Sequence, residues 1–375
     1  MNKQLNEIDE RILGISQRID FYSFLTPVNQ SEEEERFFRS LREGERYNPT
    51  FRYKTGDFSR ERKSLEQMRG LLDPNDDLQR IFLNKIDFMT GQIDLLTKGD
   101  AAFTEISGQL YGMPDPGDAR IALGILSEKK EQEYAFPEET VTPEEMSRVL
   151  RNKLEYKGID WPVVLTDRII SKISISGKTR TVYVNSGLNY TVEEVPRLEV
   201  HEVEVHVYRG ANGEKQPFNI FREGLAGYNE TEEGLAIIAE DVSGCLEIDT
   251  RQMKLYAGRH LGVDYSLKGS FREAFIKLRE FFPDYLAYRL TERAKRGLED
   301  TSSKGGFTRD IHYISGSQKM RKYIANGGIL SILYVGKVGL GDVDTISRLI
   351  RKGELMQPLF LPEFIGEDGK IAKKT

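Results

Sequence analysis

Two of the four histidines in this 375-residue chain stand five positions apart, in the sequence His201-Glu202-Val203-Glu204-Val205-His206. Side chains with that separation diverge by about 140° on a regular α-helix, because each residue turns the helix by roughly 100°. A local π-helix, with i→i+5 hydrogen bonds, brings them back onto one face, and such segments are frequent at functional sites. If both imidazoles serve one site, the helix must be wound wide between residues 201 and 206.

Composition narrows the class of protein. The chain has 54 basic and 60 acidic side chains and a formal charge of −6, so a basic nucleic-acid-binding surface is not expected. The single Cys245 excludes an internal disulfide framework and a zinc ribbon built from cysteines. No apolar run approaches the roughly 18 residues that cross a membrane, and the N-terminus lacks a signal peptide's apolar segment. We expect a cytoplasmic protein with no nucleic-acid or membrane partner, and the oligomeric state stays open.

The first hundred residues have the pattern of a helical region. Apolar side chains recur every three or four positions in residues 5–19, as on one face of a helix. Residues 59–72 and 77–98 predict two more helices. Ser31 and Glu34 have the spacing of a capping box and predict the start of another.

A turn-forming sequence, Gly-Met-Pro-Asp-Pro-Gly at residues 112–117, predicts a domain boundary. We assign residues 1–115 to an N-terminal helical region and residues 116–366 to a catalytic domain. Residues 367–375 form a polar tail, which we expect to fray because nothing in its composition holds it to a core.

The catalytic domain combines helices with a few short strands. Thr142, followed by a proline and two glutamates, predicts the start of a helix. Residues 163–165, 172–176 and 179–184 have the short apolar pattern of strands, and helices dominate from there to about residue 326. The expected fold class is α+β, mostly helical, with a small mixed sheet.

Two neutral imidazoles and a carboxylate are the protein ligands of many catalytic zinc ions, with a fourth position left for water. His201 and His206 supply the imidazoles. The sequence Glu232-Glu233-Gly234-Leu235-Ala236 offers the carboxylate from a second helix, and it resembles the ligand element of zincins whose third ligand is a glutamate. We assign Glu233 to the metal, and the small residues that follow predict a close approach of this helix to the histidine helix.

Two further glutamates have expected roles beside the metal. Glu232 is a candidate acceptor for the N–H group of a ligand histidine. Glu202 is next to a ligand without being one, so it can take a proton from the attacking water and return it to the leaving amine. A purely structural zinc site needs no such free carboxylate and usually has four protein ligands. Glu202 therefore favours a hydrolytic enzyme.

Together these motifs resemble those of a known family. The histidine motif, Arg209, Asn212-Gly213, Gln216-Pro217 and residues 228–236 are similar to motifs of the microtubule-associated tyrosine carboxypeptidases and of bacterial proteins with a Gln-Glu-Gly-Leu-Ala motif. Four more segments match patterns of this family: residues 48–53, 103–112, 307–313 and 334–337. The resemblance covers most of the chain from about residue 46 to about residue 362.

The resemblance implies a zinc carboxypeptidase of the HExxxH type, with the two histidines and a glutamate as Zn²⁺ ligands and a peptide or protein C-terminus as substrate. It also implies a zincin-like catalytic domain with an HExxxH metal helix. Two positions depart from the family. Thr231 precedes Glu232 where glutamine is usual, which leaves the ligand intact. Glu204 stands where a small residue is expected, and we expect its carboxylate to point to solvent.

A carboxypeptidase must hold a terminal carboxylate and polarise the scissile carbonyl. We expect Thr308 to cap a helix, with Arg309 and Tyr313 at i and i+4 on one face. Arg309 is the candidate for binding the carboxylate, and Tyr313 for donating a hydrogen bond to the oxyanion. Two interpretations are open for the strand that ends at Asn185: an ordinary strand inside a sheet, or an edge strand that pairs with an extended peptide. The second makes Asn185 a candidate substrate-binding residue.

Two other functions remain open from the sequence alone. A zinc amidohydrolase acting on non-peptide amides would use the same metal ligands and Glu202. A zinc-stabilised regulatory or scaffold protein without hydrolytic activity is the other, suggested by the "expression-modulating" description of some bacterial relatives. The free carboxylate of Glu202 is the feature that argues against the second.

Overall fold

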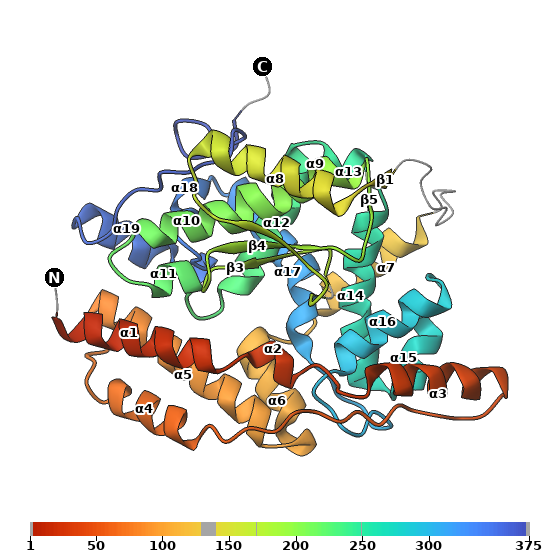
Figure 1. Cartoon of the computed structure of the whole chain (residues 1–375). Coiled ribbons are helices and arrows are strands. Elements are labelled where there is room, and N and C mark those ends of the chain that lie inside the picture. The colour runs from red at the N-terminus through yellow and green to blue at the C-terminus, as the bar shows by residue number, and fades with distance from the viewer. Residues whose placement is uncertain (1–2, 129–139, 170, 249, 373–375) are drawn as a thin grey trace.

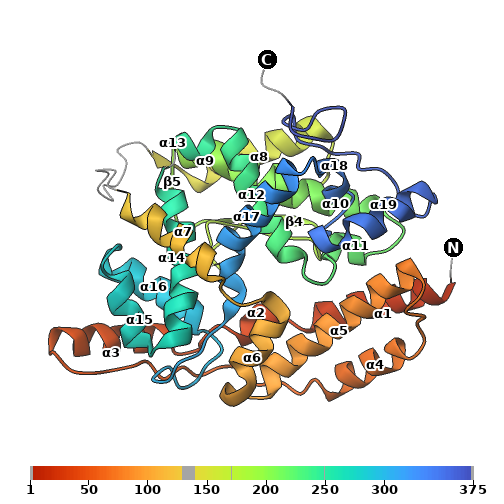
Figure 2. The same cartoon turned by 180° about the vertical axis from the view of Figure 1, so that it is seen from behind.

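Helices form most of the structure, and two small sheets lie among them (Figure 1 and Figure 2). The computed structural model describes residues 3–128, 140–169, 171–248 and 250–372. Within these residues no helix is both long enough and apolar enough to traverse a lipid bilayer. Many helices with small sheets agree with the expected mostly helical α+β class.

The N-terminal helices are α1 (Lys3–Arg18), α2 (Phe21–Phe24), α3 (Gln30–Arg42), α4 (Ser59–Arg69), α5 (Asp77–Thr97) and α6 (Asp100–Tyr111). Helices α1, α4 and α5 contact one another and form the lower left layer in Figure 1. The helices predicted over residues 5–19, 59–72 and 77–98 are confirmed. The capping box predicted at Ser31 is wrong, because α3 begins at Gln30, after Asn29, and no side chain caps its first turn.

The strands are β1 (Thr140–Val141), β2 (Val163–Thr166), β3 (Ile173–Ser176), β4 (Thr181–Asn185) and β5 (Tyr190–Thr191). In the larger sheet β4 lies between β2, which is parallel to it, and β3, which is antiparallel. The sheet is therefore mixed, as predicted. Of the two interpretations of the strand that ends at Asn185, the ordinary inner strand is confirmed and the free edge is wrong, because neighbouring strands pair with both sides of its backbone.

The helices of the next part of the chain are α7 (Pro116–Ser127), α8 (Pro143–Lys157), α9 (Glu194–Leu198), the π-helix η1 (Glu199–Val207), α10 (Tyr208–Lys215), α11 (Ile220–Glu223) and α12 (Tyr228–Val242). The predicted start at Thr142 is confirmed, since Thr142 and Glu145 form a complete capping box and Pro143 takes the first position. The π-helix contacts α8, β3 and α12, so it lies inside the fold and not at its surface.

The remaining helices are α13 (Cys245–Ile248), α14 (Thr250–Lys268), α15 (Phe271–Leu278), α16 (Asp284–Lys295), the 3₁₀-helix η2 (Thr308–Ile311), α17 (His312–Ala325), α18 (Leu330–Leu333), the 3₁₀-helix η3 (Leu340–Asp342) and α19 (Val343–Arg351). Helix α17 packs along α12 near the middle of the molecule (Figure 2). A Cβ atom on Gly234 would lie 2.3 Å from the backbone carbonyl carbon of Gly316. Helix α12 also packs against the histidine helix η1, as predicted, but the backbone nearest to Gly234 itself belongs to α17.

The N-terminal helices are joined to the rest of the chain by shared apolar packing and by Asp9. One hydrophobic cluster includes Leu5 of α1 and Val203 of η1. The carboxylate of Asp9 accepts hydrogen bonds from the backbone N–H groups of Asn219, at 2.7 Å, and of Ile220, at 3.1 Å. These N–H groups belong to the start of α11, where backbone donors lack partners within the helix. The boundary after residue 115 stays a prediction.

The polar tail makes backbone hydrogen bonds where the structure describes it. The N–H of Gly366 donates to the carbonyl of Lys370 and the N–H of Ala372 to that of Phe364, both at 2.8 Å. These bonds involve the described part of the tail, its last three residues lie outside the described residues, and the fraying of the tail stays a prediction.

Candidate metal centre

The helix between the two histidines is π-helical, as the five-residue spacing requires. It runs from Glu199 to Val207 and continues directly from α9 into α10. The ring centroids of His201 and His206 are 4.8 Å apart, with the rings at 80° to each other. The wide winding thus places both imidazoles on the same side of one helix.

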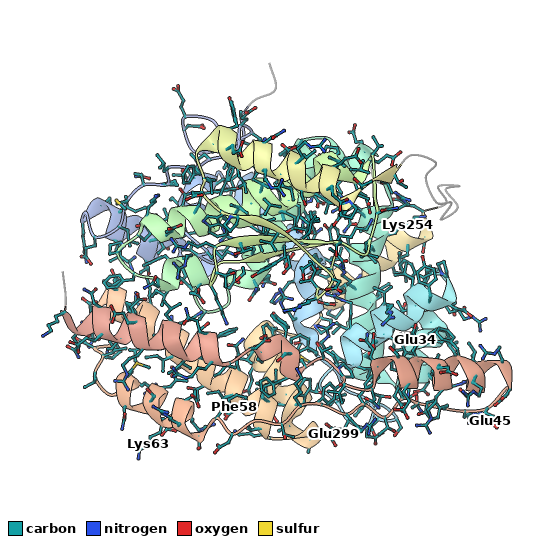
Figure 3. All side chains as sticks on the ribbon, in the orientation of Figure 1. Glu34, Glu45, Phe58, Lys63, Lys254 and Glu299 are labelled. Carbon is teal, nitrogen blue, oxygen red and sulfur yellow. The ribbon has the colours of Figure 1, made fainter. Side chains whose placement is uncertain are left out.

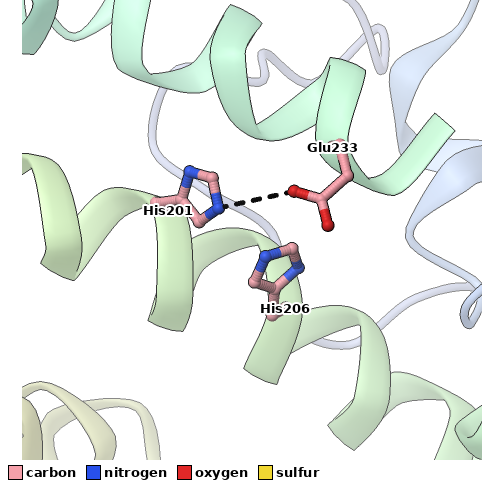
Figure 4. A group of neighbouring side chains, drawn as sticks. All are labelled: His201, His206 and Glu233. Atoms are coloured by element: carbon pink, nitrogen blue, oxygen red, sulfur yellow. Dashed lines mark ion pairs between the residues drawn. The ribbon is translucent and has the colours of Figure 1, made fainter. Parts of the chain in front are cut away.

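Glu233 of α12 completes a cluster with the two histidines (Figure 4). One possible ligand atom from each of the three residues lies within 4.8 Å of the other two. The Nε2 atom of His201 is 3.8 Å from the Oε2 atom of Glu233. His201 and Glu233 are buried and His206 nearly so, because its side chain is only 12% exposed.

Each histidine is fixed from behind by a glutamate of α12. Nδ1 of His206 donates to Oε1 of Glu232 at 2.9 Å, and Nδ1 of His201 donates to Oε1 of Glu240 at 2.7 Å. The donors are the ring nitrogens, because ionised carboxylates only accept hydrogen bonds. The earlier histidine pairs with the later glutamate, so α12 runs antiparallel to η1.

Glu240 is not among the residues predicted from the sequence. A usable signal was present, since Glu240 follows Glu233 by seven residues, which is two turns of an α-helix and therefore the same face. Glu240 also accepts from the hydroxyl of Tyr256 at 2.9 Å and from Arg197 at 3.2 Å. These contacts hold the carboxylate in one orientation behind His201.

Buried cations stabilise Glu232 in its charged form. Its carboxylate pairs with Arg209, and it lies 3.1 Å from Nζ of Lys337. Burial alone would raise the pKa of this carboxyl group, but the charges of Arg209 and Lys337 and the hydrogen bond from His206 hold it well below its usual value. Glu232 is therefore ionised at neutral pH and remains an acceptor for His206.

The pKa of the His201 imidazole is shifted in the other direction, upward. Burial would lower the pKa of its imidazole, but the hydrogen bond to Glu240 and the negative charge of Glu240 raise it above the ordinary value. The same contacts that favour a proton on this ring also make its free nitrogen a more basic metal ligand.

The donor set fits a zinc ion. With Nδ1 of both rings engaged, Nε2 of His201 and of His206 is the nitrogen left for a metal, beside the carboxylate of Glu233. Two imidazoles and one carboxylate match the protein ligands of catalytic zinc sites, which leave a position for water. The residues present are therefore compatible with a metal of that type.

Glu202 and Glu204 have different surroundings, although both belong to η1. Glu202 is half-buried, and no hydrogen bond or ion pair joins it to any residue that the structure describes. The expectation that Glu204 points to solvent is wrong. Its side chain is buried and pairs with Nζ of Lys153 on α8 at 2.7 Å, and Lys153 also contacts Glu199 at 3.0 Å. The extra carboxylate is thus neutralised by a neighbouring helix.

Arg309 lies beside the metal cluster, but not in the local structure that the sequence predicted. Its Nη2 atom is 3.4 Å from Oε1 of Glu233, and its side chain is 19% exposed. Thr308 does not cap a helix, because its hydroxyl and backbone N–H bond to Ser107 of α6. Arg309 therefore lies in the 3₁₀-helix η2, one turn before α17 and Tyr313.

Tyr313 is buried against aromatic and charged groups near the cluster. Its ring stacks on Tyr256 at 4.9 Å, and the guanidinium of Arg259 lies 4.5 Å from the ring centroid. Burial raises the pKa of the Tyr313 hydroxyl to about 12, and the charge of Glu233 acts in the same direction. The hydroxyl therefore keeps its proton at neutral pH and can donate a hydrogen bond.

Asn185 is engaged in the turns at the end of its strand. Its amide donates to the carbonyl of Ile169 at 2.6 Å and accepts from the N–H of Gly187 at 2.9 Å. The basis for a substrate-binding role, pairing of a free edge with a peptide, is removed by the central position of β4.

Comparisons with known proteins match these motifs. The sequence model of the family described as microtubule-associated tyrosine carboxypeptidase matches residues 35–374. Microtubule-associated tyrosine carboxypeptidase 1 of Homo sapiens is 28% identical over 207 residues, which cover 52% of this chain and 42% of that protein. The protein of the same name from Rattus norvegicus is 24% identical over 333 residues, covering 86% of this chain and 61% of its own length. The chain thus spans less than two thirds of these relatives.

Proposed function

Because the chain belongs to the microtubule-associated tyrosine carboxypeptidase family, we propose that it is a zinc-dependent carboxypeptidase that removes a C-terminal residue from a peptide or protein. The observation that carries the proposal is the convergence of His201, His206 and Glu233 beside a glutamate, Glu202, that has no partner among the described residues. The single cysteine and the absence of a basic surplus support a cytoplasmic protein that does not act on nucleic acid.

In this proposal Nε2 of each histidine and a carboxylate oxygen of Glu233 hold the zinc ion. When bound there, the ion would act as a Lewis acid and lower the pKa of a water molecule to about 7. Glu202 accepts a proton from the attacking water and passes it to the leaving amine. Glu232 and Glu240 keep the two imidazoles in the tautomer that exposes Nε2.

Arg309 and Tyr313 are proposed to contact the substrate. Arg309 is partly exposed, is held near Glu233, and has an Nε atom without a hydrogen-bond partner in the described part of the chain. This unpaired donor suits a terminal carboxylate, to which guanidinium groups bind in a bidentate manner. The protonated hydroxyl of Tyr313 donates to the oxygen that becomes negative during attack.

The first test replaces Glu202 by Gln. The variant should fold and bind one zinc per chain, but it should not hydrolyse peptides that end in tyrosine, the residue named for the relatives, because an amide cannot accept the proton of the water. Glu204→Gln is the matched control, since Glu204 belongs to the same helix and pairs with Lys153. Elemental analysis and peptide hydrolysis are the measurements. Parental activity of Glu202→Gln, or no metal in the unaltered protein after zinc soaking, contradicts the proposal.

A second test separates exopeptidase from endopeptidase action. Arg309→Ala should lower kcat/KM for peptides with a free C-terminus by about one to two decades, the equivalent of losing a charge-assisted contact of roughly 1.5–3 kcal/mol. It should leave any slow cleavage of C-terminally amidated peptides unchanged. Arg321→Ala on α17, which removes an exposed arginine paired with Asp241, is the control. An unaltered protein that cleaves amides as fast as free acids is an endopeptidase, and the carboxypeptidase proposal fails.

A further inference from the structure

A short N-terminal helix reaches the candidate site. The ring of Tyr22, on α2, lies 5.3 Å from Cζ of Arg309. Helix α2 is close to α6 and the start of α17 in both whole-chain views (Figure 1 and Figure 2). Phe21 fixes it there by packing on Phe307, with ring centroids 6.4 Å apart. The match to the family model begins at residue 35, so this helix belongs to the part of the chain that precedes it.

Burial does not account for the position of Tyr22. Its side chain is 41% exposed, whereas Phe21 is 7% and Leu25 is 2% exposed. The apolar contacts that anchor α2 are therefore made by Phe21 and Leu25. What Tyr22 adds is an aromatic face within the 6 Å distance at which a guanidinium is attracted to a ring.

Arg309 has few other contacts that fix its orientation. Its hydrogen bond to Glu233 is long, at 3.4 Å, and its Nε atom is buried without a partner among the described residues. With so few contacts, the guanidinium of Arg309 has several possible orientations. Each side-chain rotation that is lost when a substrate binds costs affinity. An aromatic ring stacked on the plane of the guanidinium restricts its orientation. The N–H groups of the guanidinium remain available for the substrate, because stacking uses no donor.

We propose that Tyr22 is a positioning residue for the substrate's terminal carboxylate. Its ring holds the Arg309 guanidinium beside Glu233, so the N-terminal segment that precedes the family match sets the affinity for a free C-terminus. The inference rests on the proposed function, since it takes Arg309 as the group that binds the carboxylate. Tyr22 itself acts through Arg309.

The experiment measures binding without turnover, in the Glu202→Gln background, by titrating a peptide with a free C-terminus and its C-terminal amide. Tyr22→Leu should weaken binding of the free acid by about threefold to thirtyfold, the range of cation–π contacts from exposed to desolvated sites. Binding of the amide should not change. Tyr22→Phe keeps the ring and should bind as the parent does. In the active protein, Tyr22→Leu should raise KM more than it lowers kcat.

Phe24→Leu is the matched control for damage to α2. Phe24 lies on the same helix, and its ring packs edge-on against Phe58, one of the residues labelled in Figure 3, with centroids 5.2 Å apart. Equal losses in Tyr22→Leu and Phe24→Leu would mean that the helix, and not the ring, matters. A further loss from Tyr22→Leu when Arg309 is already Ala would show that it does not act through Arg309. Either result overturns the inference.

The same titration separates this inference from the proposed function. If the protein with intact Tyr22 binds the free acid and the amide equally, both the carboxypeptidase proposal and the inference fail. If it prefers the free acid and Tyr22→Leu leaves that preference unchanged, only the inference fails.

Discussion

Replacing Glu240 by Gln should reveal how much the site depends on the carboxylate behind His201. The side chain of Glu240 is fully buried, and it accepts hydrogen bonds from His201 at 2.7 Å, Tyr256 at 2.9 Å and Arg197 at 3.2 Å. Breaking a buried ion pair costs about 3–5 kcal/mol. The amide oxygen of Gln can still accept a hydrogen bond, so we expect about 3 kcal/mol less stability in the metal-free protein.

Zinc affinity should fall as well, because the amide no longer favours the tautomer that exposes Nε2 of His201. Loss of a carboxylate behind a metal-binding histidine lowers metal affinity by about 10–100-fold. Denaturant unfolding of the metal-free protein and competition with a chelator measure the two effects. The control is Asp241→Asn, the next residue of α12, whose ion pair with Arg321 is exposed and is worth at most about 1 kcal/mol. If Glu240→Gln behaves like Asp241→Asn in both assays, Glu240 does not support the site.

Two further perturbations test the packing and the buried charges around this site. Gly234→Ala should destabilise the protein by about 1–3 kcal/mol, because the added Cβ would lie 2.3 Å from the backbone of Gly316. Gly124→Ala in α7, where no other atom of the described residues lies within 4 Å of the added Cβ, should instead stabilise it by up to about 1 kcal/mol. Equal thermal shifts of the two variants would contradict this account. Burial lowers the pKa of Lys85 from 10.5 to about 8 in the folded protein. The unfolded chain therefore binds the proton of Lys85 more tightly than the folded protein does. As a result, the free energy of unfolding should rise with pH between about 8 and 10.5. The free energy of unfolding of the parent, minus that of Lys85→Met, should rise by roughly 2 kcal/mol from pH 7 to pH 9.5. A difference that does not change with pH would contradict the lowered pKa of Lys85.

Features set by short-range chemistry could be predicted from the sequence. The helix start at Thr142 depends on four consecutive residues, and all of its predicted contacts are present. The π-helix follows from the five-residue spacing once both histidines must face one site. Glu233 was placed with His201 and His206 from its sequence context, and the three lie together.

Features set by contacts between distant segments could not be predicted. Thr308 has the composition of a helix cap, but its hydroxyl and N–H are taken by Ser107, 201 positions earlier in the chain. Glu204 is buried because it pairs with Lys153 of another helix. The pairing of β4 on both sides depends on the order of the strands in the sheet. The contact of Tyr22 with Arg309 joins residues that lie far apart in the sequence, and no local pattern signals it.

Between the two histidines, the π-helix contains one residue more than a regular α-helix would need to place them on one face. Deleting one position between His201 and His206 would leave the histidines four apart, a spacing that a regular α-helix already places on one face. The side chains after the deletion would nearly keep their facing relative to those before it, because four residues at about 100° each complete roughly one turn of an α-helix. Arg209 follows His206 on the same continuous helix and pairs with Glu232, so it would move together with that histidine. The surplus residue is therefore absorbed by the wide winding between the two histidines, and the helix on either side of it keeps the register in which α12 meets both histidines and the arginine.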